Sequence, residues 1–320
     1  MASTPATKPA LITGIHHVTA LAKGPRENLG FYGGVLGLRF IKRTVNFDDP
    51  FTYHLYYGDA VGTPGSLLTH FPHPMAARAM HGTGEIRRTV LAVPFGSMGY
   101  WQDRLGAAGV EFATSVRFDR PRLEFTDPDG MELGIVEGEV QDVGEAWEGG
   151  GVTPGHAVRT VDTVTLRVPT AEATGEFLAG ALGFAAGEVE GDRRLFTLGN
   201  GGPGRRLELI DDAQGQHQPM GAGTVHHVAW RVPDEATQRE VSNRLFAAGT
   251  ATTQIIDRQY FHSIYFRIPG GVIFEVATDG PGFAVDEPME ELGARLQLPP
   301  QHEPMRARIE AQLVSLDSEG

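Results

Sequence analysis

Four segments of the chain begin with a similar apolar run and then follow the same order. The runs are HHVTALA, RRTVLAVP, DTVTLRVP and HHVAWRVP, and each has the length and apolar character of a buried strand. A stretch with helical spacing follows, as at residues 99–108 and 235–248. Alternating β-branched and aromatic runs, separated by Gly and Pro turns, complete each segment. Each segment is therefore predicted to be a βαβββ module.

Repeated strings support this division, because RLGAAG at residues 104–109 recurs as RLFAAG at residues 244–249. The fold class predicted is α+β, with four βαβββ modules forming two barrel-like domains. The modules are placed at residues 12–75, 84–138, 158–212 and 222–278. The two domains are predicted at residues 12–138 and 158–278, with a Gly-rich linker at 137–159. A C-terminal extension is predicted at 283–320, with a short helix at 304–313, and the first ten residues are predicted to be a loose tail.

Composition narrows the classes of function. The 320 residues are 41% hydrophobic, which suits a globular protein with a substantial core. The net charge of −13 argues against a nucleic-acid partner and against an anionic membrane surface. There are no cysteines, so disulfides and thiolate metal sites are excluded, and no apolar run has the length of a membrane span. A cytoplasmic location is the expectation.

The candidate chemistry lies in two histidine pairs about 210 residues apart, His16-His17 and His226-His227, each of which opens a module. Glu275 follows in VIFEVATD, late in an apolar strand. Two imidazoles and one carboxylate are the ligands of a facial triad, which holds a divalent metal and leaves open positions. If these groups converge, the chain is a metalloenzyme.

Comparison between modules serves as an internal control. Arg88 and Thr163 stand where modules two and three would carry the second histidine of the pair, and Gly134 stands at the position of Glu275 in module two. We infer that only modules one and four keep ligand-type residues at these positions. The scaffold therefore forms without histidine or glutamate there.

Two questions stay open from the residues alone. Neighbours on a strand point to opposite faces, so only one histidine of each pair should bind a metal, unless a bulge brings both near. Burying an isolated carboxylate is costly, so Glu275 needs either a metal or an ion pair, for which Arg258 and Arg267 are candidates.

The hairpin that carries Glu275 can be placed in register. A turn at Pro269-Gly270-Gly271 would join two antiparallel strands and set Tyr265 directly opposite Glu275. One face of this hairpin then carries the polar residues and the other the apolar ones. The polar face either lines a site or faces solvent.

These residues make the chain similar to the vicinal oxygen chelate superfamily of glyoxalases, bleomycin-resistance proteins and extradiol dioxygenases. Within it, the strings FYGGVLGLRFIKRTVNFDDP and DRQYFHSIYFRIPGGVIFEVATDGPGF resemble two-domain dioxygenases that cleave the ring of para-hydroquinones. The resemblance implies that His17, His227 and Glu275 bind iron. It also implies that the neighbours of the metal and contacts of the substrate are His16, His226, Arg258 and Tyr265, with His262 a weaker candidate for the pocket rim.

The resemblance implies further that modules one and four share the metal-bearing sheet. The expected cofactor is Fe(II), although Mn(II) suits the same ligands. The expected partners are a small aromatic diol and O2, with no nucleic acid and no membrane, and a homo-oligomer fits this kind of enzyme. Tyr265, His16 and His226 would handle protons, and Arg258 would stabilise negative charge on oxygen.

Two other functions remain under consideration. A glyoxalase-like lyase or isomerase would use the same fold and a metal without O2, but such sites generally need a fourth protein ligand. The end of module one, GSLLTHFPH, offers no carboxylate, although His70 could take that role. A metal-free protein that sequesters small molecules would leave the three ligand-type residues unexplained.

Overall fold

The computed structural model describes residues 11–316, so the predicted tail of ten residues and the last four residues of the extension lie outside the described part. The described chain consists of four βαβββ modules and an extension, as the apolar pattern predicted. Module 1 contains β1 (Gly14–Ala22), α1 (Pro25–Leu29) with a π-helical turn (Gly30–Val35), β2 (Arg39–Val45), β3 (Tyr53–Gly58) and β4 (Leu67–Pro72). Module 2 contains β5 (Glu85–Val93), α2 (Met98–Ala107), β6 (Phe112–Arg117), β7 (Arg120–Thr126) and β8 (Glu132–Glu137).

The second half of the chain repeats this order. Module 3 contains β9 (Thr160–Val168), α3 (Ala171–Leu182), β10 (Ala185–Glu190), β11 (Arg193–Thr197) and β12 (Arg206–Asp211). Module 4 contains β13 (Val225–Val232), α4 (Glu235–Ala247), β14 (Ile256–Asp257), β15 (Phe261–Arg267) and β16 (Ile273–Pro281). The predicted helix at residues 99–108 differs from α2 by one residue at each end, and the one at 235–248 differs from α4 by one residue at its C-terminal end.

Local chemistry explains where the helices begin and end. The Asp234 side chain accepts a hydrogen bond from the backbone N–H of Thr237 at 2.8 Å, which satisfies a free donor in the first turn of α4. Helix α3 ends at Gly183, whose φ of 79° lies in the left-handed region that glycine adopts without steric cost.

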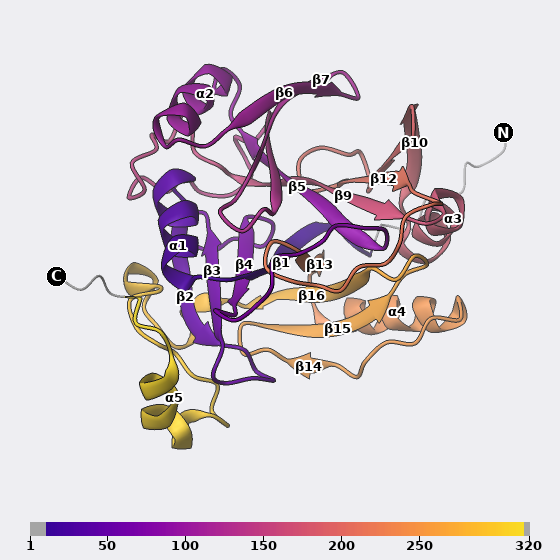
Figure 1. Ribbon diagram of the computed structural model, residues 1–320. Coiled ribbons are helices and arrows are strands. Elements are labelled where there is room, and N and C mark those ends of the chain that lie inside the picture. The colour runs from indigo at the N-terminus through magenta and orange to yellow at the C-terminus, as the bar shows by residue number, and fades with distance from the viewer. Residues whose placement is uncertain (1–10, 317–320) are drawn as a thin grey trace.

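Strand pairing joins modules from opposite halves of the chain. Strand β1 pairs antiparallel with β13, and β5 pairs antiparallel with β9, so module 1 joins module 4 and module 2 joins module 3 (Figure 1). This pairing is the one that the resemblance implied. The module 1–4 sheet has the strand order β14-β15-β16-β13-β1-β4-β3-β2, and the module 2–3 sheet has the order β10-β11-β12-β9-β5-β8-β7-β6. A β-bridge between Val225 and Ile86 connects the two sheets.

The limits of the two predicted domains and their barrel-like closure stay predictions. The strand pairing shows that each half of the chain contributes one module to each sheet. One large apolar cluster, which includes Val18, Leu91, Val164 and Val228, runs through all four modules. The sheets are therefore fixed relative to one another by shared side-chain packing.

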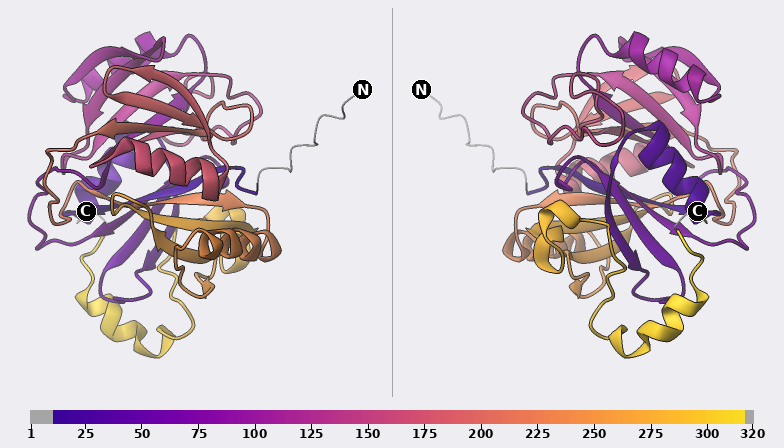
Figure 2. Two further views of the ribbon diagram at one scale, coloured as in Figure 1. Left: turned by 90° about the vertical axis from the view of Figure 1, so that its right-hand side faces the viewer. Right: turned by 90° about the vertical axis from the view of Figure 1, so that its left-hand side faces the viewer.

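The extension packs along module 1, on the side of the molecule away from α2 (Figure 2). Its short helix is α5 (Arg306–Gln312), preceded by a 3-10 turn (Glu303–Met305), at the place where the sequence predicted one. Ile309 packs against Val45 of β2 in a small apolar cluster. The buried Lys42 ammonium lies 2.6 Å from Asp286 and 2.5 Å from Glu287, so ion pairs also hold the extension to β2.

Among residues 11–316, no helix is long and apolar enough to cross a membrane.

Candidate metal centre

His17, His227 and Glu275 come together on three neighbouring strands of the module 1–4 sheet. His17 on β1 lies opposite Ala229 on β13, and Ala229 lies opposite Glu275 on β16. His227 precedes Ala229 by two residues and so shares its face of the sheet. This register places residues from both ends of the chain around one point.

The three side chains are close enough to share one cation. The Nε2 atoms of His17 and His227 lie 3.2 and 2.8 Å from Oε2 of Glu275, and 3.3 Å from each other. All three side chains are buried. In the described part of the chain they form the one cluster of His, Asp and Glu whose ligand atoms are all within 4.8 Å of one another.

The surroundings of Glu275 fit a cation better than an ion pair with arginine. Its Oε1 accepts a hydrogen bond from Ser263, but within residues 11–316 its buried Oε2 has no hydrogen-bond donor apart from the two imidazole nitrogens. Burial raises the pKa of Glu275, but the neighbouring His17 and His227 outweigh this effect and hold that pKa well below its usual range. The carboxylate is therefore charged, and it faces two nitrogens that can bind a metal.

Neither arginine proposed as its alternative partner reaches Glu275. Arg258 donates from Nε to the hydroxyl of Tyr265 at 3.2 Å and lies 3.5 Å from Asp48. Arg267 donates to the backbone carbonyl of Gly271. The ion-pair alternative left open by the sequence is thus not the arrangement observed.

The first histidine of each pair contacts the second on the side away from Glu275. The β1–β13 register shifts between Ile15 and His17 and again opposite His226, so each strand bulges at the first histidine of its pair. The Nδ1 atoms of His16 and His17 are 2.9 Å apart, and those of His226 and His227 are 2.7 Å apart. With Nε2 of the second histidine facing the cation site, its Nδ1–H can donate to the first, which orients both rings.

A cavity of about 390 Å³ opens onto this cluster. Arg258 and Tyr265, both expected near the metal, line it, and so does His226. Tyr265 lies directly opposite Glu275, in the register predicted for the hairpin, so the polar face of that hairpin lines the cavity. Much of the remaining wall is aromatic or aliphatic, as suits an aromatic ligand: Leu21, Phe47, Phe71, Phe261 and Ile273.

Two histidines singled out in the sequence lie elsewhere. The prediction that His262 lies at the pocket rim was wrong, because its Nδ1 is 2.6 Å from Glu235 of α4 and its side chain faces away from the cavity. His70 does not supply a fourth ligand. It follows Thr69 on β4 and points to the opposite face, where its ring centroid lies 4.2 Å from that of Tyr32.

Module 1 supplies the polar cavity residues that the sequence analysis missed. They lie on or beside β2, β3 and β4: Asn46, Asp48, His54, Tyr56 and His73. The internal repeat holds the signal that finds two of them, since HLYY of β3 aligns with SIYF of β15. Tyr56 lies opposite Thr69 as Tyr265 lies opposite Glu275. Thr69 therefore occupies in module 1 the position that Glu275 occupies in module 4.

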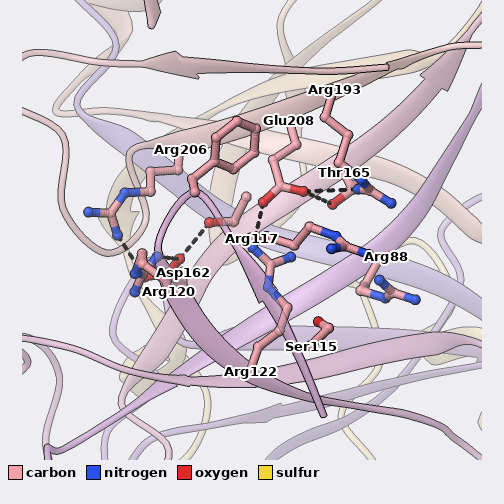
Figure 3. A network of polar contacts seen from close by, with 12 residues as sticks. Arg88, Ser115, Arg117, Arg120, Arg122, Asp162, Thr165, Arg193, Arg206 and Glu208 are labelled. Carbon is pink, nitrogen blue, oxygen red and sulfur yellow. Dashed lines mark hydrogen bonds and ion pairs between the residues drawn. The ribbon is translucent and has the colours of Figure 1, made fainter. Parts of the chain in front are cut away.

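The corresponding region of the module 2–3 sheet holds an ion-pair network (Figure 3). Glu208 lies opposite Thr165 in the β12–β9 pair, at the register that Glu275 has in the β16–β13 pair. The inference that only modules one and four keep ligand-type residues was therefore wrong for module 3. The Glu208 carboxylate accepts hydrogen bonds from Arg122 at 2.7 Å and Thr165 at 3.0 Å, and it lies 3.3 Å from Arg193. Guanidinium groups neutralise this buried carboxylate.

The chain matches the family model described as the Glyoxalase/Bleomycin resistance protein/Dioxygenase superfamily over residues 14–135 and 160–276. It is 43% identical over 307 residues to the "Putative ring-cleaving dioxygenase MhqO" of Bacillus subtilis, covering 95% of this chain and 96% of that protein. It is 30% identical over 310 residues to the chlorohydroquinone/hydroquinone 1,2-dioxygenase of Sphingobium indicum, covering 94% and 96% of the two chains.

Solved structures show the same fold. A crystal structure of a "putative dioxygenase" from Bacillus subtilis superimposes with a TM-score of 0.91 at 41% identity, covering 97% of this chain and 99% of that one. Glyoxalase I from Zea mays superimposes with a TM-score of 0.61 at 13% identity, covering 83% and 92% of the two chains. At that identity, the maize enzyme is a likeness of fold alone.

Proposed function

The chain belongs to the glyoxalase/bleomycin resistance protein/dioxygenase superfamily, and on that basis we propose that it is an Fe(II)-dependent dioxygenase that cleaves the ring of a para-hydroquinone. His17, His227 and Glu275 are the proposed iron ligands. The observation that carries the proposal is this buried triad beside a cavity whose wall combines polar groups with aromatic and aliphatic side chains.

The donor set fits a divalent ion with open positions. Two imidazole nitrogens and one carboxylate oxygen suit Fe(II), and Mn(II) prefers the same geometry. The buried Oε2 of Glu275, which has no donor other than the two imidazoles in the described part of the chain, is the ligand atom that a cation would satisfy. When bound, the ion supplies Lewis acidity toward a substrate hydroxyl and electron transfer toward O2.

The chain's own residues bind and orient the reactants. Arg258 lies 5.2 Å from the centre of the Tyr265 ring and holds the hydroxyl of that residue beside the cavity. Burial, together with the charge of Glu275, raises the pKa of Tyr265, so its hydroxyl keeps its proton at neutral pH and donates to a substrate oxygen. The Arg258 guanidinium stabilises negative charge on that oxygen. His226 lines the cavity and is a second group that can exchange a proton with the substrate.

A glyoxalase-like reaction is less well supported. The position in module 1 that corresponds to Glu275 is Thr69, whose hydroxyl is 2.8 Å from both Thr19 and His54. Threonine at that position leaves the metal without a second carboxylate, so more positions stay open for reactants. A metal-free binding protein would bury Glu275 beside His17 and His227 without using the ligand set that these three side chains form.

Oxygen consumption distinguishes the three functions. Protein loaded with Fe(II) under reducing conditions is expected to consume one O2 for each hydroquinone, because both oxygen atoms enter the ring-opened product. An oxygen electrode with hydroquinone, and with catechol as the comparison substrate, measures this uptake. Isomerisation of a glutathione hemithioacetal without O2 uptake would establish the glyoxalase-like reaction, and binding of hydroquinone without turnover would establish the sequestering protein.

Replacing Tyr265 with phenylalanine is expected to lower kcat about 100-fold, the usual effect of losing a group that transfers or holds a proton. The melting temperature should change little, since one net hydrogen bond contributes only about 1 kcal/mol. Steady-state oxygen uptake and thermal unfolding measure the two effects. Tyr100→Phe, which removes a phenol hydroxyl far from the cavity, is the control. Equal losses of activity and stability in Tyr265→Phe would indicate a structural role.

The cytoplasmic location and the homo-oligomer stay predictions.

A further inference from the structure

A second tyrosine lines the cavity at the position that corresponds to Tyr265. Tyr56 of module 1 lies opposite Thr69 on β4, as Tyr265 of module 4 lies opposite Glu275 on β16. Both tyrosines line the same cavity, one from each module of the sheet. The oxygen of Tyr265 accepts a hydrogen bond from Arg258, which leaves its own proton free to donate.

Tyr56 is the last member of a buried hydrogen-bond chain. The hydroxyls of Thr19 and Thr69 are 2.8 Å apart, and Thr69 is 2.8 Å from Nε2 of His54. Nδ1 of His54 is 3.0 Å from the hydroxyl of Tyr56. All four side chains are buried, and of the four only His54 and Tyr56 line the cavity.

The direction of this chain follows from counting its protons. Each hydroxyl carries one proton, and His54 carries one as well, since burial lowers its pKa well below the usual range and keeps it neutral. Three bonds use three protons, so one proton remains, on Thr19, Thr69 or Tyr56. No acceptor outside this chain is found for the Thr19 or the Thr69 hydroxyl in residues 11–316, and a buried donor without an acceptor costs about 1–3 kcal/mol. The bonds therefore run from Thr19 through Thr69 and His54 to Tyr56.

We propose that Tyr56 is a substrate-binding residue that donates its remaining proton, as a hydrogen bond, to an oxygen of the aromatic diol. This inference rests on the proposed function. Thr69, His54 and Thr19 act as positioning residues, because they hold the oxygen of Tyr56 as an acceptor and direct its proton to the cavity. Burial raises the pKa of Tyr56, so it donates a hydrogen bond and does not act as a base at neutral pH. Two phenol hydroxyls, from Tyr56 and Tyr265, thus recognise a ligand with anionic oxygen.

Substrate binding without O2 tests the role of Tyr56 separately from turnover. In calorimetric titration of iron-loaded protein with hydroquinone under nitrogen, Tyr56→Phe should raise Kd about tenfold, as expected for one hydrogen bond to a charged oxygen. The matched control is Tyr57→Phe, which removes a buried phenol hydroxyl bonded to Asn28 outside the cavity, 2.9 Å from its acceptor. Its Kd should stay unchanged. Iron content and melting temperature are measured for both variants.

Thr69→Val tests the direction of the chain. Thr69 does not line the cavity, but without its hydroxyl His54 can carry its proton on Nε2 and accept from Tyr56 on Nδ1. The Tyr56 proton would then turn away from the cavity, so Kd should rise in Thr69→Val. The double variant with Tyr56→Phe should bind no more weakly than Tyr56→Phe alone.

The outcomes separate this inference from the proposed function. Wild-type binding of hydroquinone with an unchanged Kd in Tyr56→Phe would overturn the role of Tyr56 and leave the proposed function standing. A tenfold effect in Tyr57→Phe as well would also overturn it, because a general loss of packing would then explain both variants. No binding of hydroquinone by wild-type protein would contradict the proposed function together with this inference.

Discussion

Glu275→Ala is expected to lose bound iron and oxygen uptake together. The carboxylate supplies one of three proposed ligands and the only negative charge among them. Losing a residue that merely orients a ligand lowers metal affinity roughly 10–100-fold, so removal of the ligand itself should exceed about 100-fold. Metal analysis after desalting and an oxygen electrode measure the two losses. His227→Ala should behave in the same way.

Two variants serve as controls for this test. Ser263→Ala keeps the three ligands and removes the hydrogen bond to Oε1 of Glu275, so it should weaken iron binding by roughly tenfold and keep some activity. Glu132→Gln removes a carboxylate paired with Arg87 and Arg88 in the other sheet and should leave the iron content unchanged. Wild-type iron content and oxygen uptake in folded Glu275→Ala would refute the ligand assignment.

Glu208→Gln is expected to destabilise the fold by about 3–5 kcal/mol, the usual cost of removing one partner from a buried ion pair. Arg122 is 2% exposed and would keep its charge without the carboxylate that neutralises it. Arg193 would lose the same partner. Urea unfolding followed by circular dichroism measures the change. Iron content in the folded variant should match the wild type, because Glu208 lies in the other sheet.

An exposed ion pair provides the comparison for Glu208. Glu240 and Arg244 are 3.0 Å apart on α4, with about half of the Glu240 side chain, 51%, exposed to solvent. Glu240→Gln should cost only about 0.3–0.5 kcal/mol, since solvent already screens this pair. If Glu208→Gln also costs less than about 1 kcal/mol, the network in Figure 3 does not stabilise the protein in the way argued.

The two sheets neutralise corresponding buried carboxylates in different ways. In the module 1–4 sheet Glu275 faces two imidazole nitrogens whose histidines line a cavity, whereas in the module 2–3 sheet Glu208 faces Arg122 and Arg193. A buried carboxylate needs a cation in either case. A guanidinium fills its site with protein atoms, while a metal leaves positions for reactants. Under the proposed function, the repeat thus provides one sheet for chemistry and one for stability.

Much of the fold could be predicted because its signals are local. Strand-length apolar runs and the Gly and Pro turns between them predicted four βαβββ modules, and helical spacing placed α2 and α4 to within one residue. The hairpin register followed from its turn, so Tyr265 opposite Glu275 was correct. The repeated histidine pair and the carboxylate in an apolar strand predicted the kinds of ligand, while the family resemblance singled out His17, His227 and Glu275, whose side chains do converge.

Other features depended on partners that are distant in the chain. His262 was misplaced because its neighbour Glu235 lies on a helix that the strand pattern does not position. Glu208 was overlooked as a counterpart of Glu275, because the match shows only when parallel strand registers are compared. The roles of His54 and Tyr56 likewise required the hydrogen bonds between β3, β4 and β1.

The sequence by itself determined the repeat, the element order and the ligand-type residues of the site, since periodicity and residue chemistry act within a few positions of the chain. Only the tertiary structure decided which histidine of each pair faces the cluster and which group neutralises each buried carboxylate. It also decided where the last proton of a hydrogen-bond chain points. These depend on bulges and cross-strand contacts between modules, and their energies arise only when distant segments exclude water together.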